Sequence, residues 1–223
     1  MGQKGQLWWD IPAIDSFELF RAIYGIERDK YKKTVDELAE ILDVGDIIDR
    51  PVRTLSLGER MKLELIGAFL HEPKIMYLDE PTIGLDFLSQ KSIREFIKKI
   101  NKDKNVAVML TSHNLKDVEE LCDRVIVINH GNKVYDDTIN KLKSIGNRKK
   151  RVTFTALSEE GLEGLEIYGK LDKIKESGEF QMNIPEELIK KVNGRILENQ
   201  NITNYRIEDE SIEDIIESIY QNK

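Results

Sequence analysis

Residues 74–81 read Lys-Ile-Met-Tyr-Leu-Asp-Glu-Pro, and residues 106–113 read Val-Ala-Val-Met-Leu-Thr-Ser-His. Each stretch is a short apolar run that ends in polar, chemically reactive side chains. Apolar runs that alternate with helical segments are typical of parallel strands covered on both faces. The pattern predicts an α/β fold, and ligands of open parallel sheets bind beyond the carboxyl ends of the strands.

Apolar residues at helical spacing surround these two strands. A further apolar run and a closing hairpin, with its turn at Gly131-Asn132, follow them. The expected elements are helices at about residues 14–24, 29–42, 59–70, 87–100 and 115–121, and strands at 74–78, 106–110, 124–128 and 133–135.

Residues 146–151 read Gly-Asn-Arg-Lys-Lys-Arg, a basic break that we interpret as a solvated linker and domain boundary. The pattern beyond it predicts a small α+β domain. Its expected strands are residues 152–157, 169–174, 179–184 and 202–207, and its expected helices are 185–197 and 211–220.

The composition limits the class of protein. A chain of 223 residues with 40% apolar residues suits one large or two small domains. The net charge of −7 argues against nucleic acid as the main partner. The single cysteine, Cys122, makes no internal disulfide and indicates a cytosolic chain. We expect no signal peptide, and no apolar run reaches the roughly 20 residues of a membrane span, so a membrane connection would require another protein.

Two strand ends carry candidate chemistry. Asp79 and Glu80 could hold Mg²⁺ and activate a water molecule, or could simply form a turn before Pro81. His113 could donate to a phosphate oxygen, or could be an ordinary loop or capping residue.

A candidate anion site precedes the third predicted helix. Residues 55–59 read Leu-Ser-Leu-Gly-Glu, and a helix start collects unpaired amides that favour anions. Gly58 lets the backbone approach a ligand closely. Alternatively, Ser56 and Glu59 have the spacing of a capping box and only start the helix.

The order of these motifs resembles the ATP-binding cassette (ABC) family. Residues 55–62 are similar to its signature loop, 73–82 to its Walker B strand, 83–86 to its D-loop, and 110–113 to its switch histidine. Residues 2–12 resemble the Q-loop of the drug-export branch, and the C-terminal domain resembles the tail of those subunits. The resemblance thus covers essentially the whole chain.

The resemblance implies a partial P-loop NTPase fold, with a helical subdomain and a parallel-sheet core, followed by a small α+β domain. We expect an ATP-binding domain at residues 1–145 and an accessory domain at 146–223. The first divides into the Q-loop at 1–12, the helical subdomain at 13–70 and the core at 71–145.

The same resemblance implies an ATP hydrolase with ATP and Mg²⁺ as cofactors. Asp79 would serve Mg²⁺, Glu80 would be the general base, and His113 would contact the γ-phosphate. Gln3 would sense Mg²⁺ and the membrane subunit, although Gln6 is a second candidate for this role.

Other residues would act across a head-to-tail dimer of ATP-binding subunits. Ser56 and Gly58 would bind the γ-phosphate of the partner's ATP, and Asp86 would lie at the dimer seam. Leu57 and Glu59 depart from the commonest signature, Leu-Ser-Gly-Gly-Gln, but neither is the anion-binding Ser or the last Gly.

The family's phosphate loop, Gly-x-x-x-x-Gly-Lys-Ser/Thr, is absent from its expected place upstream of Gln3. Residues 164–171 nearly match it, but they end in Leu and lie in the wrong order and domain. We therefore expect an N-terminally truncated subunit that neither binds nor hydrolyses ATP alone. An exposed sheet edge or apolar face, with poor solubility, is also expected.

The sequence thus predicts an ATP-binding subunit of an export transporter, with a membrane permease and a second ATP-binding subunit as partners. It would lie at the cytoplasmic face of the membrane, held by the permease. The alternatives are a non-catalytic half-module that lends its signature and D-loop surfaces to a complete partner, and a soluble non-transport ATPase. Trp8 and Trp9 could pack under the permease or in the core.

Overall fold

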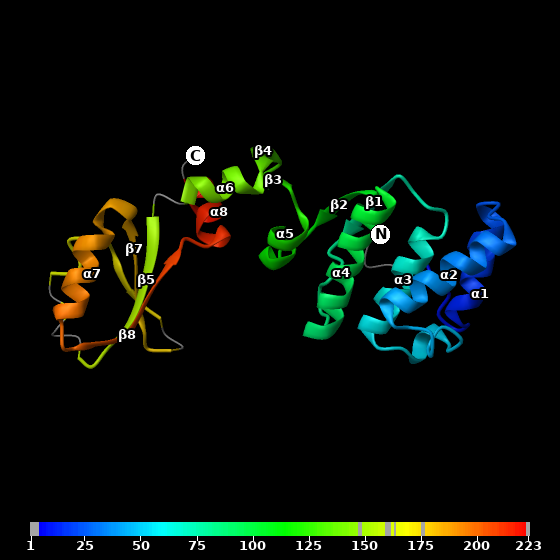
Figure 1. Cartoon of the computed structure of the whole chain (residues 1–223), viewed down its shortest axis with the longest axis horizontal. Coiled ribbons are helices and arrows are strands. Elements are labelled where there is room, and N and C mark those ends of the chain that lie inside the picture. Colours follow the sequence, from blue (N-terminus) through cyan, green and yellow to red (C-terminus); the bar gives the residue numbers. More distant parts are fainter. Residues whose placement is uncertain (1–4, 147–148, 159–161, 163, 175–176, 222–223) are drawn as a thin grey trace. The chain divides into compact units, whose positions relative to one another are not determined.

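The computed structural model describes residues 5–146, 149–158, 162, 164–174 and 177–221 (Figure 1). The chain divides into two compact units, Met1–Leu121 and Cys122–Lys223. Within the described residues, every helix is too short or too polar to span a bilayer.

The first unit begins with helices, as the apolar spacing predicts. Its helix α2 shows why: Tyr31, Val35, Leu38 and Leu42 lie on one stripe and are buried in the core. The side chain of Glu27 accepts hydrogen bonds from the first-turn amides and so starts this helix. The elements are α1 (Ala13–Ile23), α2 (Arg28–Leu42), the 3₁₀ turn η1 (Val52–Thr54) and α3 (Leu57–Phe69).

The strands β1 (Ile75–Asp79) and β2 (Ala107–Thr111) pair in parallel, as predicted. Helix α4 (Phe87–Lys104) connects them and runs beside them (Figure 1), and α5 (Leu115–Leu121) follows β2. The register places Asp79 opposite Thr111, so the two reactive strand ends meet at one edge.

The two faces of this sheet differ. Met76 and Leu78 are buried, whereas Ile75, Tyr77 and Met109 have exposed fractions of 53%, 63% and 56%. The expectation that both faces are covered is therefore wrong for the described residues. The apolar face that the sequence analysis expects to be exposed is found on this side of the sheet.

In the second unit, β3 (Arg124–Asn129) and β4 (Asn132–Thr138) form the expected antiparallel hairpin. Its turn is His130-Gly131, one residue earlier than predicted, because both residues adopt positive φ values of 46° and 76°. Two-residue hairpin turns in which both residues have positive φ match the right-handed twist of the flanking strands. Helix α6 (Ile139–Gly146) follows the hairpin.

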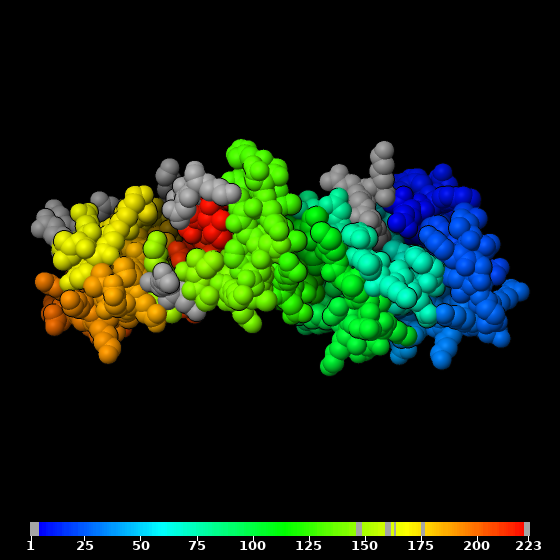
Figure 2. Space-filling model, turned by 90° about the horizontal axis from the view of Figure 1, so that it is seen from above, coloured from blue at the N-terminus to red at the C-terminus, as the bar shows by residue number. Residues whose placement is uncertain are grey.

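The rest of this unit is the predicted α+β arrangement. Its sheet has the order β6-β7-β5-β8, and every described pairing is antiparallel. A buried cluster joins Phe154 and Leu165 to Val192 and Ile196 of α7, and Figure 2 shows the orange α7 region packed against the yellow residues before it. The elements are β5 (Lys149–Ala156), β6 (Leu171–Lys173), β7 (Phe180–Pro185), η3 (Glu186–Leu188), α7 (Ile189–Glu198), β8 (Ile202–Asp209) and α8 (Ile212–Gln221).

The basic break at residues 146–151 differs from its interpretation as a linker. Lys149, Lys150 and Arg151 belong to β5 and pair with β7 and β8, and residues 147–148 lie outside the described residues. Lys150 forms an ion pair with Asp209, so acids distant in sequence neutralise part of the run.

The compact units divide earlier than the expected boundary at residue 146. Helix α6 packs on α8 and also contacts the β3–β4 hairpin, which groups the hairpin with the C-terminal sheet. The division into residues 1–145 and 146–223 remains a prediction.

Candidate functional site

The carboxyl edge of the β1–β2 sheet gathers three of the predicted site residues. The Thr111 hydroxyl donates to Asp79 Oδ1 at 2.5 Å. The Glu80 backbone N–H donates to the Thr111 carbonyl at 3.0 Å, and Glu80 itself adopts a left-handed φ of 48°. Thr111, which the motif reading did not single out, therefore links both carboxylate residues; its place at the end of the second strand is the signal that could have revealed it.

Glu80 also reaches the next loop. Its Oε2 lies 2.9 Å from His113 Nδ1 and 3.4 Å from the His113 backbone nitrogen, which donates to it. The Glu80 side chain is 25% exposed and that of His113 is 69% exposed. A carboxylate and an imidazole thus lie within ion-pair distance of each other at the surface, where a ligand can reach both.

A buried polar network supports the loops behind this edge. Asp117 is fully buried and accepts hydrogen bonds from Thr82, from Ser112 at 3.1 Å and from Arg94 at 2.9 Å. Thr82 follows β1 and Ser112 follows β2, so one carboxylate holds both loops. Sequence reasoning missed this network, because an acid in the first turn of a helix usually faces solvent.

Ser56 forms the capping box that the sequence analysis gives as the alternative to an anion site. Its Oγ accepts from the Glu59 N–H at 3.2 Å, and Glu59 Oε2 accepts from the Ser56 N–H at 2.8 Å. Hydrogen bonding to Ser56, by its backbone first and its side chain second, lowers the pKa of Glu59. The helix start is therefore partly satisfied by its own carboxylate.

Gly58 and Asp86 meet where α3 and α4 begin. A Cβ atom at Gly58 would lie 2.3 Å from Ser89 Oγ and 3.5 Å from Asp86 Oδ2, so a close approach requires glycine here. Asp86 caps α4, accepting from the Ser89 hydroxyl at 2.6 Å and its N–H at 3.0 Å, and these bonds lower the pKa of Asp86. The signature-like loop and the D-loop-like turn thus form a second group of predicted site residues.

Gln3 lies outside the described residues. Gln6 is described, and its backbone N–H donates to Glu64 Oε2 at 2.8 Å. Trp8 and Trp9 are 57% and 54% exposed, so packing in the core is excluded for both.

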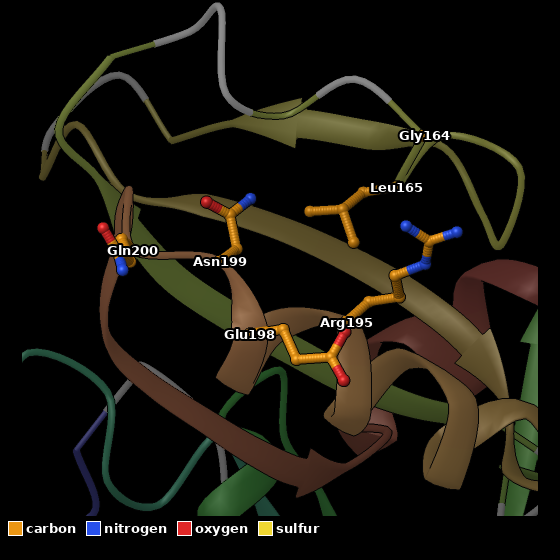
Figure 3. Close-up of a pocket in the computed structure, with 6 residues that line it drawn as sticks. All are labelled: Gly164, Leu165, Arg195, Glu198, Asn199 and Gln200. Carbon is orange, nitrogen blue, oxygen red and sulfur yellow. The ribbon is translucent and has the colours of Figure 1, made fainter.

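A hollow in the second unit contains none of the predicted site residues. It measures about 380 Å³ and is lined by Gly164, Leu165, Arg195, Glu198, Asn199 and Gln200 (Figure 3).

The near-match to a phosphate loop at residues 164–171 ends in β6 at Leu171 instead of a helix, and a Cβ at Gly169 would lie 2.7 Å from the Asn183 carbonyl oxygen. The string therefore forms turns that lead into a strand, and it is not a phosphate cradle.

Comparison with known proteins bears on the first unit. A family model described as "AAA domain, putative AbiEii toxin, Type IV TA system" matches residues 13–116. The ABC transporter ATP-binding protein NatA of Bacillus subtilis is 32% identical over 141 residues, which are 63% of this chain and 56% of NatA. An uncharacterized ABC transporter ATP-binding protein of the same organism, YhcH, is 38% identical over 111 residues, which are 50% of this chain and 35% of YhcH.

The matched region is similar to ABC transporter ATP-binding proteins, and the chain spans less than two thirds of the length of each of these relatives. Solved structures of this class share its fold. An ATP-binding subunit of an ABC transporter aligns with a TM-score of 0.56 at 21% identity, covering 64% of this chain and 59% of that one. CbiO1 of Clostridium perfringens aligns with a TM-score of 0.56 at 23% identity, covering 62% and 55%. The partial P-loop NTPase fold is thereby confirmed.

The oxygen-rich edge of the β1–β2 sheet is suited to Mg²⁺ only in part. Asp79, Glu80 and Thr111 offer hard oxygen ligands. Within the part of the chain that the structure describes, however, no three His, Cys, Asp or Glu side chains could together hold a metal. Mg²⁺ commonly binds through one or two carboxylates together with waters and substrate phosphates. The edge therefore fits a cation that arrives with a nucleotide.

Proposed function

We propose that this chain is the signature-to-switch portion of an ATP-binding subunit that drives an ABC transporter of the export type. The observation that carries the proposal is the cluster of Asp79, Glu80 and His113 around Thr111. A general base, a cation ligand and a phosphate contact are the groups that phosphoryl transfer to water needs.

The residues take distinct roles in this proposal. Asp79 holds Mg²⁺, which neutralises phosphate charge when it is bound with ATP. Glu80 orients the attacking water and accepts its proton, and His113, held by Glu80 through Nδ1, has Nε2 left for the γ-phosphate. Gln3 senses the cation and the membrane partner.

The second group acts on a partner's nucleotide. Ser56 and Gly58 lie at the start of α3, where backbone amides and the helix dipole favour anions. Asp86 lies against this helix start, at the seam of a head-to-tail dimer with a second ATP-binding subunit. A permease is the remaining partner, and it would place the subunit at the cytoplasmic face of the membrane.

The 223 residues contain no Gly-x-x-x-x-Gly-Lys-Ser/Thr loop. Hydrogen bonds to charged groups contribute about 1.5–3 kcal/mol each, so several of them amount to on the order of 5–10 kcal/mol. At roughly 1.4 kcal/mol per tenfold, affinity for ATP falls at least about a thousandfold. Titration of this chain with fluorescent ATP and Mg²⁺ should show no binding at micromolar concentrations, and micromolar affinity contradicts the proposal.

Hydrolysis is tested on the product of the longest reading frame that contains these residues. We expect Glu80→Gln to lower turnover by about 10²–10⁴-fold while leaving ATP binding intact. The matched control is Glu95→Gln, whose carboxylate is 65% exposed on α4. Unchanged turnover in Glu80→Gln contradicts the assignment of the general base.

One alternative is favoured by a specific observation. The Gly58–Ser89 packing assembles the signature and D-loop surfaces in a chain without a phosphate loop. A non-catalytic half-module would use them to complete a partner's ATP site. ATPase activity of a complete partner subunit that rises on adding this chain, and fails to rise with Gly58→Trp, supports this alternative.

A further inference from the structure

Glu64 is a buried acid that the proposed hydrolysis does not use. It lies in the middle of α3, and its exposed fraction is 4%. Its neighbours Leu63, Leu65 and Ile66 are fully buried in the core of the first unit. Burying a carboxylate is costly unless hydrogen bonds compensate, so the partners of this side chain show what it does.

The partners of Glu64 belong to the N-terminal segment. Its Oε2 accepts from the Gln6 N–H at 2.8 Å, and its Oε1 accepts from the Leu7 N–H at 3.3 Å. Gly5 approaches so closely that a Cβ atom there would lie 2.4 Å from Oε1. The Glu64 side chain thus contacts three consecutive residues, 5–7, which are distant from it in the sequence.

A second contact from the same helix meets the same segment. Arg60 lies one turn before Glu64, and its guanidinium carbon is 5.7 Å from the centre of the Trp9 ring. Burial raises the pKa of Glu64, while the amide hydrogen bonds of Gln6 and Leu7 and the charge of Arg60 oppose the rise. The side chain is buried and accepts hydrogen bonds from the backbone of residues 6 and 7, which favours a positioning role.

We propose that Glu64 is a positioning residue that latches residues 5–7 onto α3, so that this segment and the helix move together. The start of the same helix carries Ser56 and Gly58, and the latched segment leads into the exposed Trp8 and Trp9. The latch would transmit movement between the signature loop and the Q-loop segment. The transmission of movement rests on the proposed function, but the contact between Glu64 and residues 5–7 does not.

The test is backbone amide hydrogen exchange in Glu64→Gln, without nucleotide. Each carboxylate oxygen accepts from one amide, and a carboxamide replaces one of these oxygens with an NH₂ donor, so one of the two amides faces a donor instead of an acceptor. We expect exchange at Gln6 and Leu7 to quicken by about tenfold or more, since a bond to a charged group is lost. Exchange at Leu65 and Ile66 should stay unchanged. Glu40→Gln, exposed on α2, is the control.

A merely structural role predicts a different pattern, in which exchange quickens equally along α3. That result, or unchanged exchange at Gln6 and Leu7, overturns the proposal. Because the chain has two tryptophans, both beside the latch, a fall in their fluorescence anisotropy reports release of the segment.

A second variant keeps the test decisive if Glu64→Gln fails to fold. Gly5→Ala places a methyl group against Oε1 and should produce the same local change from the other side. Gly45→Ala, which has nothing within 4 Å, is its control. A Gly5→Ala chain with the exchange pattern of the unaltered chain also overturns the latch. A chain that fails to bind nucleotide leaves both results intact.

Discussion

At the scale of residues, the Glu59 side chain caps the start of α3, and the same helix start is suited to binding an anion. Its carboxylate bonds the Ser56 N–H and stands close to the positive end of α3. A phosphate arriving at this helix start would meet that negative charge. The commonest signature of the family has a neutral Gln at this position, so Glu59 adds a pH-dependent element to the loop.

The pH dependence of stability follows from the sign of this shift. The folded pKa of Glu59 lies below its ordinary value of 4.5, and the stabilisation is present above that value and lost as the pH falls through the folded pKa. We expect the difference in unfolding free energy between the unaltered chain and Glu59→Gln to be constant above about pH 6 and to shrink in acid. Denaturant titrations across this range measure it, and a difference that stays constant into acid contradicts the assignment.

The proximity of one group of site residues could be predicted because strand ends fix their positions. Asp79, Glu80 and His113 meet because parallel strands end at one edge, and the sequence shows both ends. Glu64 could not be predicted, since its burial depends on residues 5–7, which are distant in the chain.

At the scale of elements, the ion pair of Arg94 and Asp117 joins α4 to α5. Arg94 is 2% exposed and Asp117 is fully buried, and the pair also anchors the loops after β1 and β2. Breaking a buried pair leaves an uncompensated charge, which typically costs about 3–5 kcal/mol.

We therefore expect Arg94→Leu to lower the free energy of unfolding by about 3–5 kcal/mol, because Asp117 remains buried without its cation. Urea denaturation followed by circular dichroism measures the change. Lys91→Leu, on the exposed side of the same helix, should change it by less than about 0.5 kcal/mol. Equal losses in the two variants would show that the pair contributes nothing beyond helix packing.

Elements could be predicted where apolar spacing is regular, as in α2 and α4. The hairpin turn and the start of β5 were misplaced for different reasons. Positive φ at His130 is not visible in a residue pattern, and the charges of Lys149–Arg151 resemble a linker until Asp209 and Asp214 neutralise two of them.

At the scale of the whole molecule, the β1–β2 sheet presents an uncovered apolar face. Parallel sheets are normally covered on both faces, and Ile75 and Met109 are 53% and 56% exposed here. Contiguous exposed apolar surface favours association, whereas single exposed apolar residues are ordinary. The 223-residue chain should therefore associate through this face.

We expect Met109→Lys to shift the chain toward monomer, because a charge in the middle of the apolar face must lose its hydration when a second surface covers it. Sedimentation velocity over a range of concentrations measures the shift. Leu157→Lys is the matched control, since Leu157 is 73% exposed but belongs to the other unit. Association that persists in Met109→Lys and disappears in Leu157→Lys would place the contact on the C-terminal unit, and the β1–β2 face would then have no part in it.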